Sequence, residues 1–166
     1  MTKNTVRSVS KNNIGNAGEY YIASVLSAND FIATITLGRA ETYDIIAVSE
    51  NGKGKVVKIS VKTRLQKDNK FALGEKDENG GDKDGYYAFV MFNDLKTEPD
   101  FWIIPSQVVN KITKDSYQKR KEGKLSRNDT KFRNLHLKLV DGYPKDWEEQ
   151  LKIYYKNVGQ LKYFFI

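Results

Sequence analysis

The stretch from Tyr43 to Arg64, YDIIAVSENGKGKVVKISVKTR, decides the fold that we expect for this chain. Two runs rich in β-branched residues flank Asn51–Gly54, NGKG, whose residues tolerate positive φ angles, and this pattern favours a β-hairpin. A tight turn there sets Asp44 opposite either Ser60 or Lys62, and opposite residues of an antiparallel pair point to the same face. The hairpin therefore brings an acid and a lysine together at one end of two otherwise apolar strands.

Outside the hairpin, the hydrophobic pattern switches between helical and extended spacing within one domain of 166 residues. We expect helices over 14–30, over 106–123 and from 143 onward, strands over 31–37, 44–49, 86–92 and 101–104, and a strand or extended segment over 135–139. We expect the polar residues 1–13 to be flexible and a single domain over 14–166. The polar stretch 65–85 is either a mobile flap beside the site or surface disorder.

The residue types that the chain lacks restrict its chemistry. It has no cysteine and a single histidine, His136, which excludes a cysteine nucleophile and thiolate zinc sites and disfavours a multi-histidine metal site. Catalysis must therefore use carboxylates, lysine and a hard metal ion. The longest apolar run, Tyr86–Phe92, is far shorter than the ~20 residues of a bilayer span. Residues 1–13 lack the apolar core of a signal peptide, so we expect a cytosolic protein with no membrane partner.

The formal net charge of +7 is concentrated in one segment. Residues 107–138 contain ten Lys or Arg and three Asp or Glu, whereas the rest of the chain has 18 of each sign. A localised basic stripe is typical of a polyanion partner, and a solvated helical face is the alternative. The residues that we expect to contact nucleic acid are Lys111, Lys114, Lys119, Arg120, Lys121, Lys124, Arg127, Lys131 and Arg133.

The polar residues of the hairpin and of the first helix share a pattern with one enzyme superfamily. These residues are Glu19, Tyr43-Asp44 and Ser60-Val61-Lys62. In their order and spacing the chain resembles the PD-(D/E)xK nucleases, in particular the restriction-endonuclease-like and Holliday-junction-resolvase-like members, over roughly residues 15–105. Tyr43 stands where the family usually has proline, and Ser60 stands where it usually has Glu, Asp or Gln.

The resemblance implies an α/β fold with a mixed central sheet flanked by helices, and metal-dependent cleavage of DNA. It implies Asp44 as the principal Mg²⁺ ligand, Glu19 as a direct or water-mediated second ligand, and the Val61 carbonyl as a third, with Mn²⁺ as a substitute ion. Lys62 would orient or deprotonate the attacking water. The Ser60 side chain shares a face with Asp44 and Lys62, but its neutral hydroxyl is a poor metal ligand. RNA remains open as a substrate, and members of the superfamily often act as homodimers.

Simpler interpretations of the same residues stay open. Glu19 can be a first-turn acid that the helix dipole favours, Asp44 a capping aspartate, and Lys62 a lysine that protects an edge strand. Arg39 and Glu41 either assist the site or form a loop salt bridge. At the level of the whole protein, one alternative is a degenerate nuclease fold that binds nucleic acid without cleaving it, which Ser60 favours. The other is a protein-binding adaptor whose basic segment docks on an acidic partner.

Overall fold

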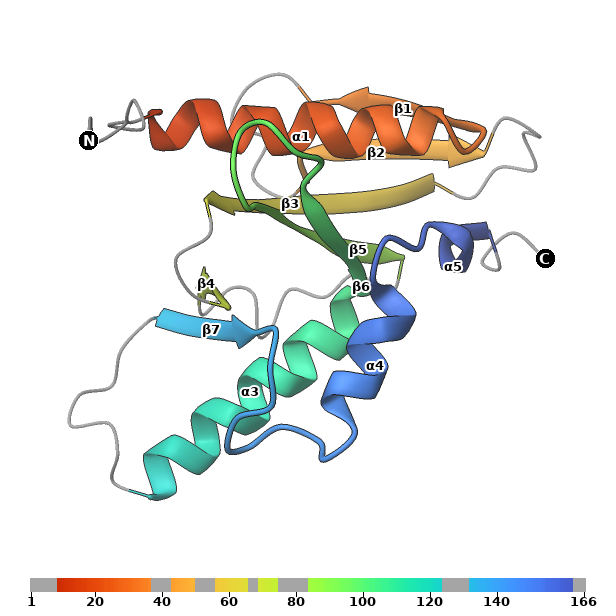
Figure 1. Ribbon diagram of the computed structural model, residues 1–166. Helices are drawn as coiled ribbons and strands as arrows, with labels where there is room; N and C mark the ends of the chain where they lie inside the picture. The colour runs from red at the N-terminus through yellow and green to blue at the C-terminus, as the bar shows by residue number, and fades with distance from the viewer. Residues whose placement is uncertain are drawn as a thin grey trace, which may run out of the picture.

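A computed structural model describes residues 9–36, 43–49, 56–65, 69–74, 84–123 and 132–162 (Figure 1). The helices and strands in chain order are α1 (Lys11–Ser27), β1 (Phe31–Ile35), β2 (Ile45–Ser49), β3 (Val56–Leu65), β4 (Lys70–Gly74), β5 (Gly85–Phe92), β6 (Asp100–Pro105), α3 (Ser106–Glu122), β7 (Phe132–His136), α4 (Trp147–Tyr154) and α5 (Gly159–Lys162). None of the helices in these ranges is both long and apolar enough to span a bilayer.

The centre of the molecule is a five-stranded sheet in the order β1-β2-β3-β5-β6. The pairs β1–β2, β2–β3 and β5–β6 are antiparallel, and β3–β5 is parallel, so the sheet is mixed. The predicted hairpin forms, with Ile45 paired to Ile59 and Val48 to Val56. The strands predicted over 86–92 and 101–104 join the same sheet as β5 and β6. The predicted α/β fold, a mixed central sheet flanked by helices, is confirmed.

Helix α1 covers one face of the sheet along β1, β2 and β3 (Figure 1). It buries Ile14, Gly18, Ile22 and Leu26, which recur every four residues and therefore form one stripe. The helix begins at Lys11, three residues before the predicted start, because the Ser10 side chain caps it by accepting the Asn13 N–H over 3.2 Å. Residues 1–8 of the segment predicted to be flexible lie outside the described residues.

A second hydrophobic cluster forms where β5 and β6 meet α3, α4 and a two-stranded sheet of β4 and β7. Its centre is Trp147, which is fully buried and whose indole N–H donates to the His136 carbonyl over 2.8 Å. Strand β4 lies within the stretch 65–85, where we predicted an unstructured flap, and that part of the prediction is wrong. Phe71 and Leu73 alternate into the cluster, 3% and 4% exposed, so burial holds the strand. Residues 75–83 are outside the described ranges.

Candidate active site

The closest approach between α1 and the sheet places Glu19 beside the end of β3. Gly18 is buried on α1, and a Cβ atom at this position would overlap the Oγ1 atom of Thr63. Only glycine lets the helix backbone come so near to the strand. The next helical residue, Glu19, therefore lies close to the Thr63 end of β3, whereas the Lys62 side chain points to the other face of this strand. The sequence contains a signal for this contact, because Gly18 occupies the apolar stripe of α1.

Asp44 is fixed at the entrance of β2 by two backbone contacts. Its N–H donates to the Ile59 carbonyl over 3.0 Å, and its Oδ2 atom accepts the Val61 N–H over 2.6 Å. The pairing of Ile45 with Ile59, continued by one residue, sets Asp44 opposite Ser60. Of the two registers that the turn allows, the one that pairs Asp44 with Ser60 is confirmed.

The two candidate carboxylates interact across the space between α1 and β2. Burial raises the pKa of Glu19, and the negative charge of Asp44 raises it further. The influence of Asp44 on Glu19 indicates that α1 and the residue before β2 bring these two acids near each other, although they are far apart in sequence. Two nearby carboxylates disfavour each other's ionised form, and a cation bound between them offsets this repulsion.

The candidate residues of β3 lie on both sides of the strand. Ser60 and Lys62 are half-buried and share one face, because side chains alternate along a strand. Val61 between them points into the core, 9% exposed, while its backbone N–H faces Asp44. In the part of the chain that the structure describes, Lys62 forms no ion pair with Asp44 or any other acid. Among the described residues, its ammonium group therefore has no carboxylate partner.

The donor atoms present fit a hard divalent cation. Over the described ranges, no three His, Cys, Asp or Glu side chains are grouped so as to hold a metal ion. Mg²⁺ does not need three, because it retains several waters and is commonly bound through one or two carboxylates. Glu19 and Asp44 supply these, and the Val61 carbonyl leaves the strand on the same side as its N–H, toward Asp44. The three ligands implied by the resemblance are thus compatible with the geometry.

The described members of the predicted nucleic-acid-binding set lie on α3, except Arg133, which lies on β7. Lys111 pairs with Asp115 over 2.7 Å on α3, and Arg120 donates to the Ser116 carbonyl over 3.3 Å. The side chains of Lys114, Lys119 and Lys121 are exposed on the same helix, whereas Lys124, Arg127 and Lys131 lie outside the described residues.

Arg133 departs from the role that we expected for it. Its side chain is buried, 5% exposed, and its guanidinium carbon lies 3.4 Å from the centre of the Tyr117 ring. Stacking on an aromatic ring is a favourable place for a guanidinium group. A side chain held there cannot reach a phosphate at the surface, so Arg133 is removed from the predicted set.

No protein-family model and no curated protein sequence matches the chain. Solved structures similar to it include two nucleases. The Holliday junction resolvase Hjc of the archaeal hyperthermophile Archaeoglobus fulgidus aligns over 74% of this chain and 83% of its own, with 17% identity and a TM-score of 0.45. The bacterial homing endonuclease I-Ssp6803I aligns over 89% of this chain and 95% of its own, with 16% identity and a TM-score of 0.48. At these identities and scores, the site is assigned on its own geometry.

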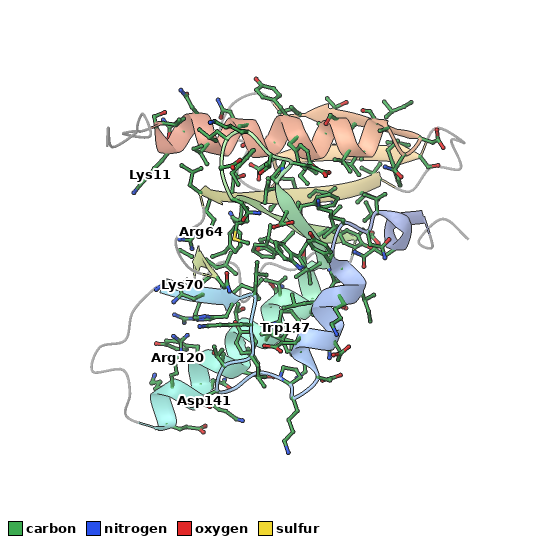
Figure 2. All side chains as sticks on the ribbon, viewed as in Figure 1. Lys11, Arg64, Lys70, Arg120, Asp141 and Trp147 are labelled. Atoms are coloured by element: carbon green, nitrogen blue, oxygen red, sulfur yellow. The ribbon has the colours of Figure 1, made fainter. Side chains whose placement is uncertain are left out.

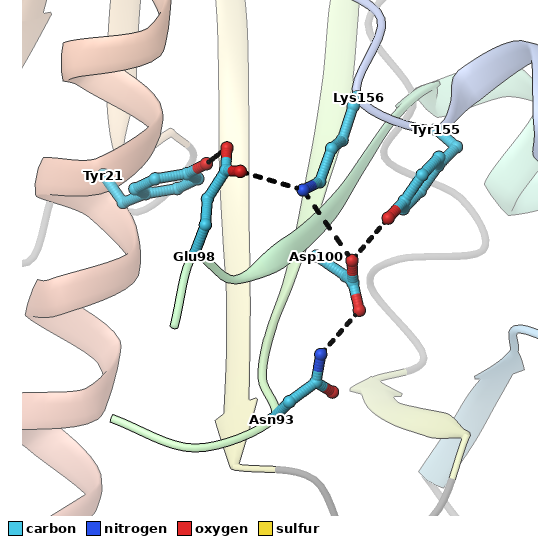
Figure 3. A network of polar contacts seen from close by, with 6 residues as sticks. All are labelled: Tyr21, Asn93, Glu98, Asp100, Tyr155 and Lys156. Carbon is cyan, nitrogen blue, oxygen red and sulfur yellow. Dashed lines mark hydrogen bonds and ion pairs between the residues drawn. The ribbon is translucent and has the colours of Figure 1, made fainter. Parts of the chain in front are cut away.

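Sequence reasoning did not find a second pair of carboxylates, Glu98 and Asp100 (Figure 3). Lys156 Nζ lies 3.2 Å from Glu98 Oε2 and 3.9 Å from Asp100 Oδ1. The Tyr21 hydroxyl donates to Glu98 Oε1 over 2.8 Å, and Asn93 Nδ2 donates to Asp100 Oδ2 over 2.7 Å. Tyr21 and Lys156 lie 77 and 58 positions from Glu98 in the sequence, so no local pattern predicts the cluster.

This second pair is electrostatically opposite to the first. The Tyr21 hydroxyl, and after it Lys156, lower the pKa of Glu98 from its ordinary value. Burial alone would lower the pKa of Lys156, but the hydrogen bond to Glu98 and the charges of Glu98 and Asp100 raise it overall. The cluster joins α1, the connection before β6 and the segment after α4, and its acids already have a cation of the protein between them.

Proposed function

We propose that this protein is a metal-dependent endonuclease that hydrolyses phosphodiester bonds in DNA, with RNA as a further substrate to be tested. The observation that supports it most is the pair Glu19–Asp44, in which burial, and after it the charge of Asp44, raises the pKa of Glu19. Acids whose pKa is raised by burial and by a second acid are candidates for functional sites. The same residues resemble the PD-(D/E)xK pattern, in which such acids bind the metal ion that cleavage requires.

Each residue of the site has a role that its position supports. Glu19 and Asp44 would bind Mg²⁺, with Mn²⁺ as an alternative, and the hydrogen bond from the Val61 N–H keeps the Asp44 carboxylate in one orientation. When Mg²⁺ is bound, it neutralises phosphate charge and lowers the pKa of a coordinated water. Lys62 is a compact cation on the face of β3 that also carries Ser60. There it would orient the attacking water and stabilise charge developing on the phosphate.

Ser60 favours a second candidate function, nucleic-acid binding without cleavage. Ser60 lies opposite Asp44. A carboxylate at this position would be a third acidic metal ligand, whereas a neutral hydroxyl is a weaker metal ligand. With two carboxylates instead of three, metal affinity is expected to be low, so activity would need millimolar Mg²⁺. A chain that binds DNA but stays inactive at every metal concentration would have this second function.

The test is a cleavage assay on duplex DNA, branched DNA, single strands and RNA, with Mg²⁺, with Mn²⁺ and with EDTA. We expect cleavage of at least one DNA substrate in either metal and none in EDTA. The Asp44→Asn variant controls for contaminating nucleases, because it should fold and bind as the wild type does. Equal cleavage by the variant would remove the proposed site. Absence of binding to every substrate would instead favour the protein-binding adaptor.

A further inference from the structure

One face of the central sheet is covered over half of its width and open over the other half. On the covered half, Tyr87, Phe89 and Met91 of β5 belong to the buried cluster beneath α3 and α4. On the open half, Ile32 of β1 and Ile46 of β2 are 61% and 38% exposed. Both isoleucines lie on the same face as the β5 residues. Ile46 pairs with Lys58 of β3, and Ser60, on the same face of β3 as Lys58, pairs with Tyr87 of β5. Strand β3 is the border between the two halves.

Along this border β3 presents a row of cations. Lys58, Ser60, Lys62 and Arg64 share the open face, because Val57, Ile59 and Val61 between them are buried. Residues two apart on a strand are roughly 6.6 Å apart, at about 3.3 Å per residue. That spacing is comparable with the distance between successive phosphates along one nucleic-acid strand. Lys62 and Arg64 match this spacing, and Lys58 lies two such steps from Lys62, with the neutral Ser60 between them.

Aromatic rings hold the two outer cations of the row. Lys58 Nζ lies 5.5 Å from the centre of the Tyr43 ring, and Arg64 Cζ lies 5.8 Å from the centre of the Phe71 ring. Cations ordered in this way lose less freedom when they bind a phosphate. Tyr43 directly precedes Asp44, so Lys58 is anchored at one side of the candidate site and Arg64 at the other. Figure 2 shows Arg64 at the end of β3, on the side toward β4.

The open half of the sheet does not oppose an anion beside this row. The same-face positions of β1 and β2, read from the register, are Ile32, Thr34, Ile46 and Val48, and all are uncharged. Asp44, which lies opposite Ser60, is an acid on this side of the sheet and belongs to the proposed metal site. A polyanion on β3 would therefore meet cations along its length and apolar side chains at its flank.

We propose that one nucleic-acid strand lies along β3, with Lys58 contacting its backbone on one side of Ser60 and Lys62, and Arg64 contacting it on the other. The proposal rests on the proposed function only for the position of the reacting phosphate. It adds binding residues outside the basic segment 107–138. A second copy of this chain, seated on the exposed isoleucines, is the competing occupant of the open half.

The test measures binding of a short duplex DNA and of one of its separated strands, by fluorescence anisotropy over a range of salt, in EDTA. The variants are Lys58→Gln, Arg64→Gln and the double substitution. Lys152→Gln is the matched control, because Lys152 is exposed on α4 and pairs with Glu149 over 2.8 Å. Each lost contact should reduce the slope of log K against log salt by about 0.9 for duplex DNA or about 0.7 for a single strand. The control slope should not change.

Four outcomes decide between the alternatives. Unchanged slopes in the double variant, or an equal change in Lys152→Gln, would overturn the placement on β3. Normal slopes in Arg64→Lys, with an unaltered thermal unfolding curve, would confirm that charge at Arg64 matters rather than packing on Phe71. A fall in sedimentation mass for Ile46→Glu, with DNA binding intact, would assign the open half to a subunit interface and overturn the proposal. If the slopes change as predicted but no metal supports cleavage, the nuclease proposal fails and the binding row stands.

Discussion

The molecule contains two pairs of carboxylates that the fold brings near each other, and the described residues supply a lysine to one pair and not to the other. Between Glu98 and Asp100 the fold places Lys156, and the Tyr21 hydroxyl, and after it Lys156, lowers the pKa of Glu98. Between Glu19 and Asp44 the described residues place no lysine or arginine, and the pKa of Glu19 rises. The residue types are the same, so composition does not separate the pairs. What separates them is whether the fold supplies the counter-charge, and only the pair without one has a reason to bind a cation from solution.

The first prediction compares the two pairs by removing one charge from each. Asp44→Asn keeps an acceptor for the Val61 N–H but removes a metal ligand, and metal-ion stabilisation is worth several kcal/mol, so cleavage should fall by about 10³-fold or more. Asp100→Asn, the matched control, should cleave like the wild type. Rates on the best substrate of the panel measure both. A large loss in Asp100→Asn, with full activity in Asp44→Asn, would reverse the assignment of the two pairs.

The second prediction displaces one member of the first pair without touching its chemistry. Gly18→Ala gains about 1 kcal/mol of helix propensity, but its Cβ overlaps Thr63, and overpacking costs about 1–3 kcal/mol, so the variant should be less stable. Because α1 must shift, Glu19 moves and cleavage should fall by about 10²-fold.

Gly15→Ala is the control for this displacement, because a Cβ at Gly15 meets nothing within 4 Å. It should stabilise the protein by about 0.5–1 kcal/mol and leave the cleavage rate unchanged. Urea denaturation and cleavage rates report both effects. Full activity in Gly18→Ala would mean that the contact with Thr63 does not position Glu19.

The difference between the two pairs also explains how far the sequence could be interpreted. The hairpin follows from local pattern, because a turn and two apolar runs limit the partner of Asp44 to Ser60 or Lys62. Glu19 was singled out by the resemblance to the PD-(D/E)xK pattern. Strand β4 could not be predicted from local pattern. Its partner β7 begins 58 positions after β4 ends, and the residues around β4 contain no signal for so distant a pairing. The burial of Arg133 depends likewise on a ring of α3, Tyr117, rather than on its neighbours in sequence.

The third prediction removes the cation from the second pair. Lys156→Met should leave Glu98 and Asp100 facing each other without a counter-charge, and the protein should lose about 1 kcal/mol of stability, because the ion pairs are partly exposed. Cleavage should be unaffected. Lys152→Met, which removes an exposed pair with Glu149, should cost less. Equal urea midpoints for the two variants would show that the Lys156 cluster has no special structural weight.

The fourth prediction uses the raised pKa of Glu19. An acid whose pKa is higher in the folded state stabilises the protein fully below its unfolded pKa, and this stability is lost as the pH rises through the folded pKa. Glu19→Gln should therefore be more stable than the wild type at about pH 7 and equal to it near or below about pH 4, in EDTA.

The size of this difference should be at most about 0.5 kcal/mol, because the side chain is only half-buried and solvent screens its charge. Added Mg²⁺ should reverse the order, because only the wild type retains both carboxylates for binding the ion. Thermal unfolding at the two pH values, with and without Mg²⁺, measures it. A variant that is less stable than the wild type at neutral pH in EDTA would contradict the coupling of Glu19 to Asp44.

The most direct test of the central claim is a calorimetric titration of Mn²⁺, which takes the same oxygen ligands as Mg²⁺. The titrated proteins are the wild type, Asp44→Asn, Asp100→Asn and Ser60→Glu. The pair Glu19–Asp44 predicts weak binding to the wild type and to Asp100→Asn, no binding to Asp44→Asn, and tighter binding to Ser60→Glu, which places a carboxylate opposite Asp44. Binding that survives in Asp44→Asn, or that disappears in Asp100→Asn, would contradict the assignment of the metal site to Glu19 and Asp44.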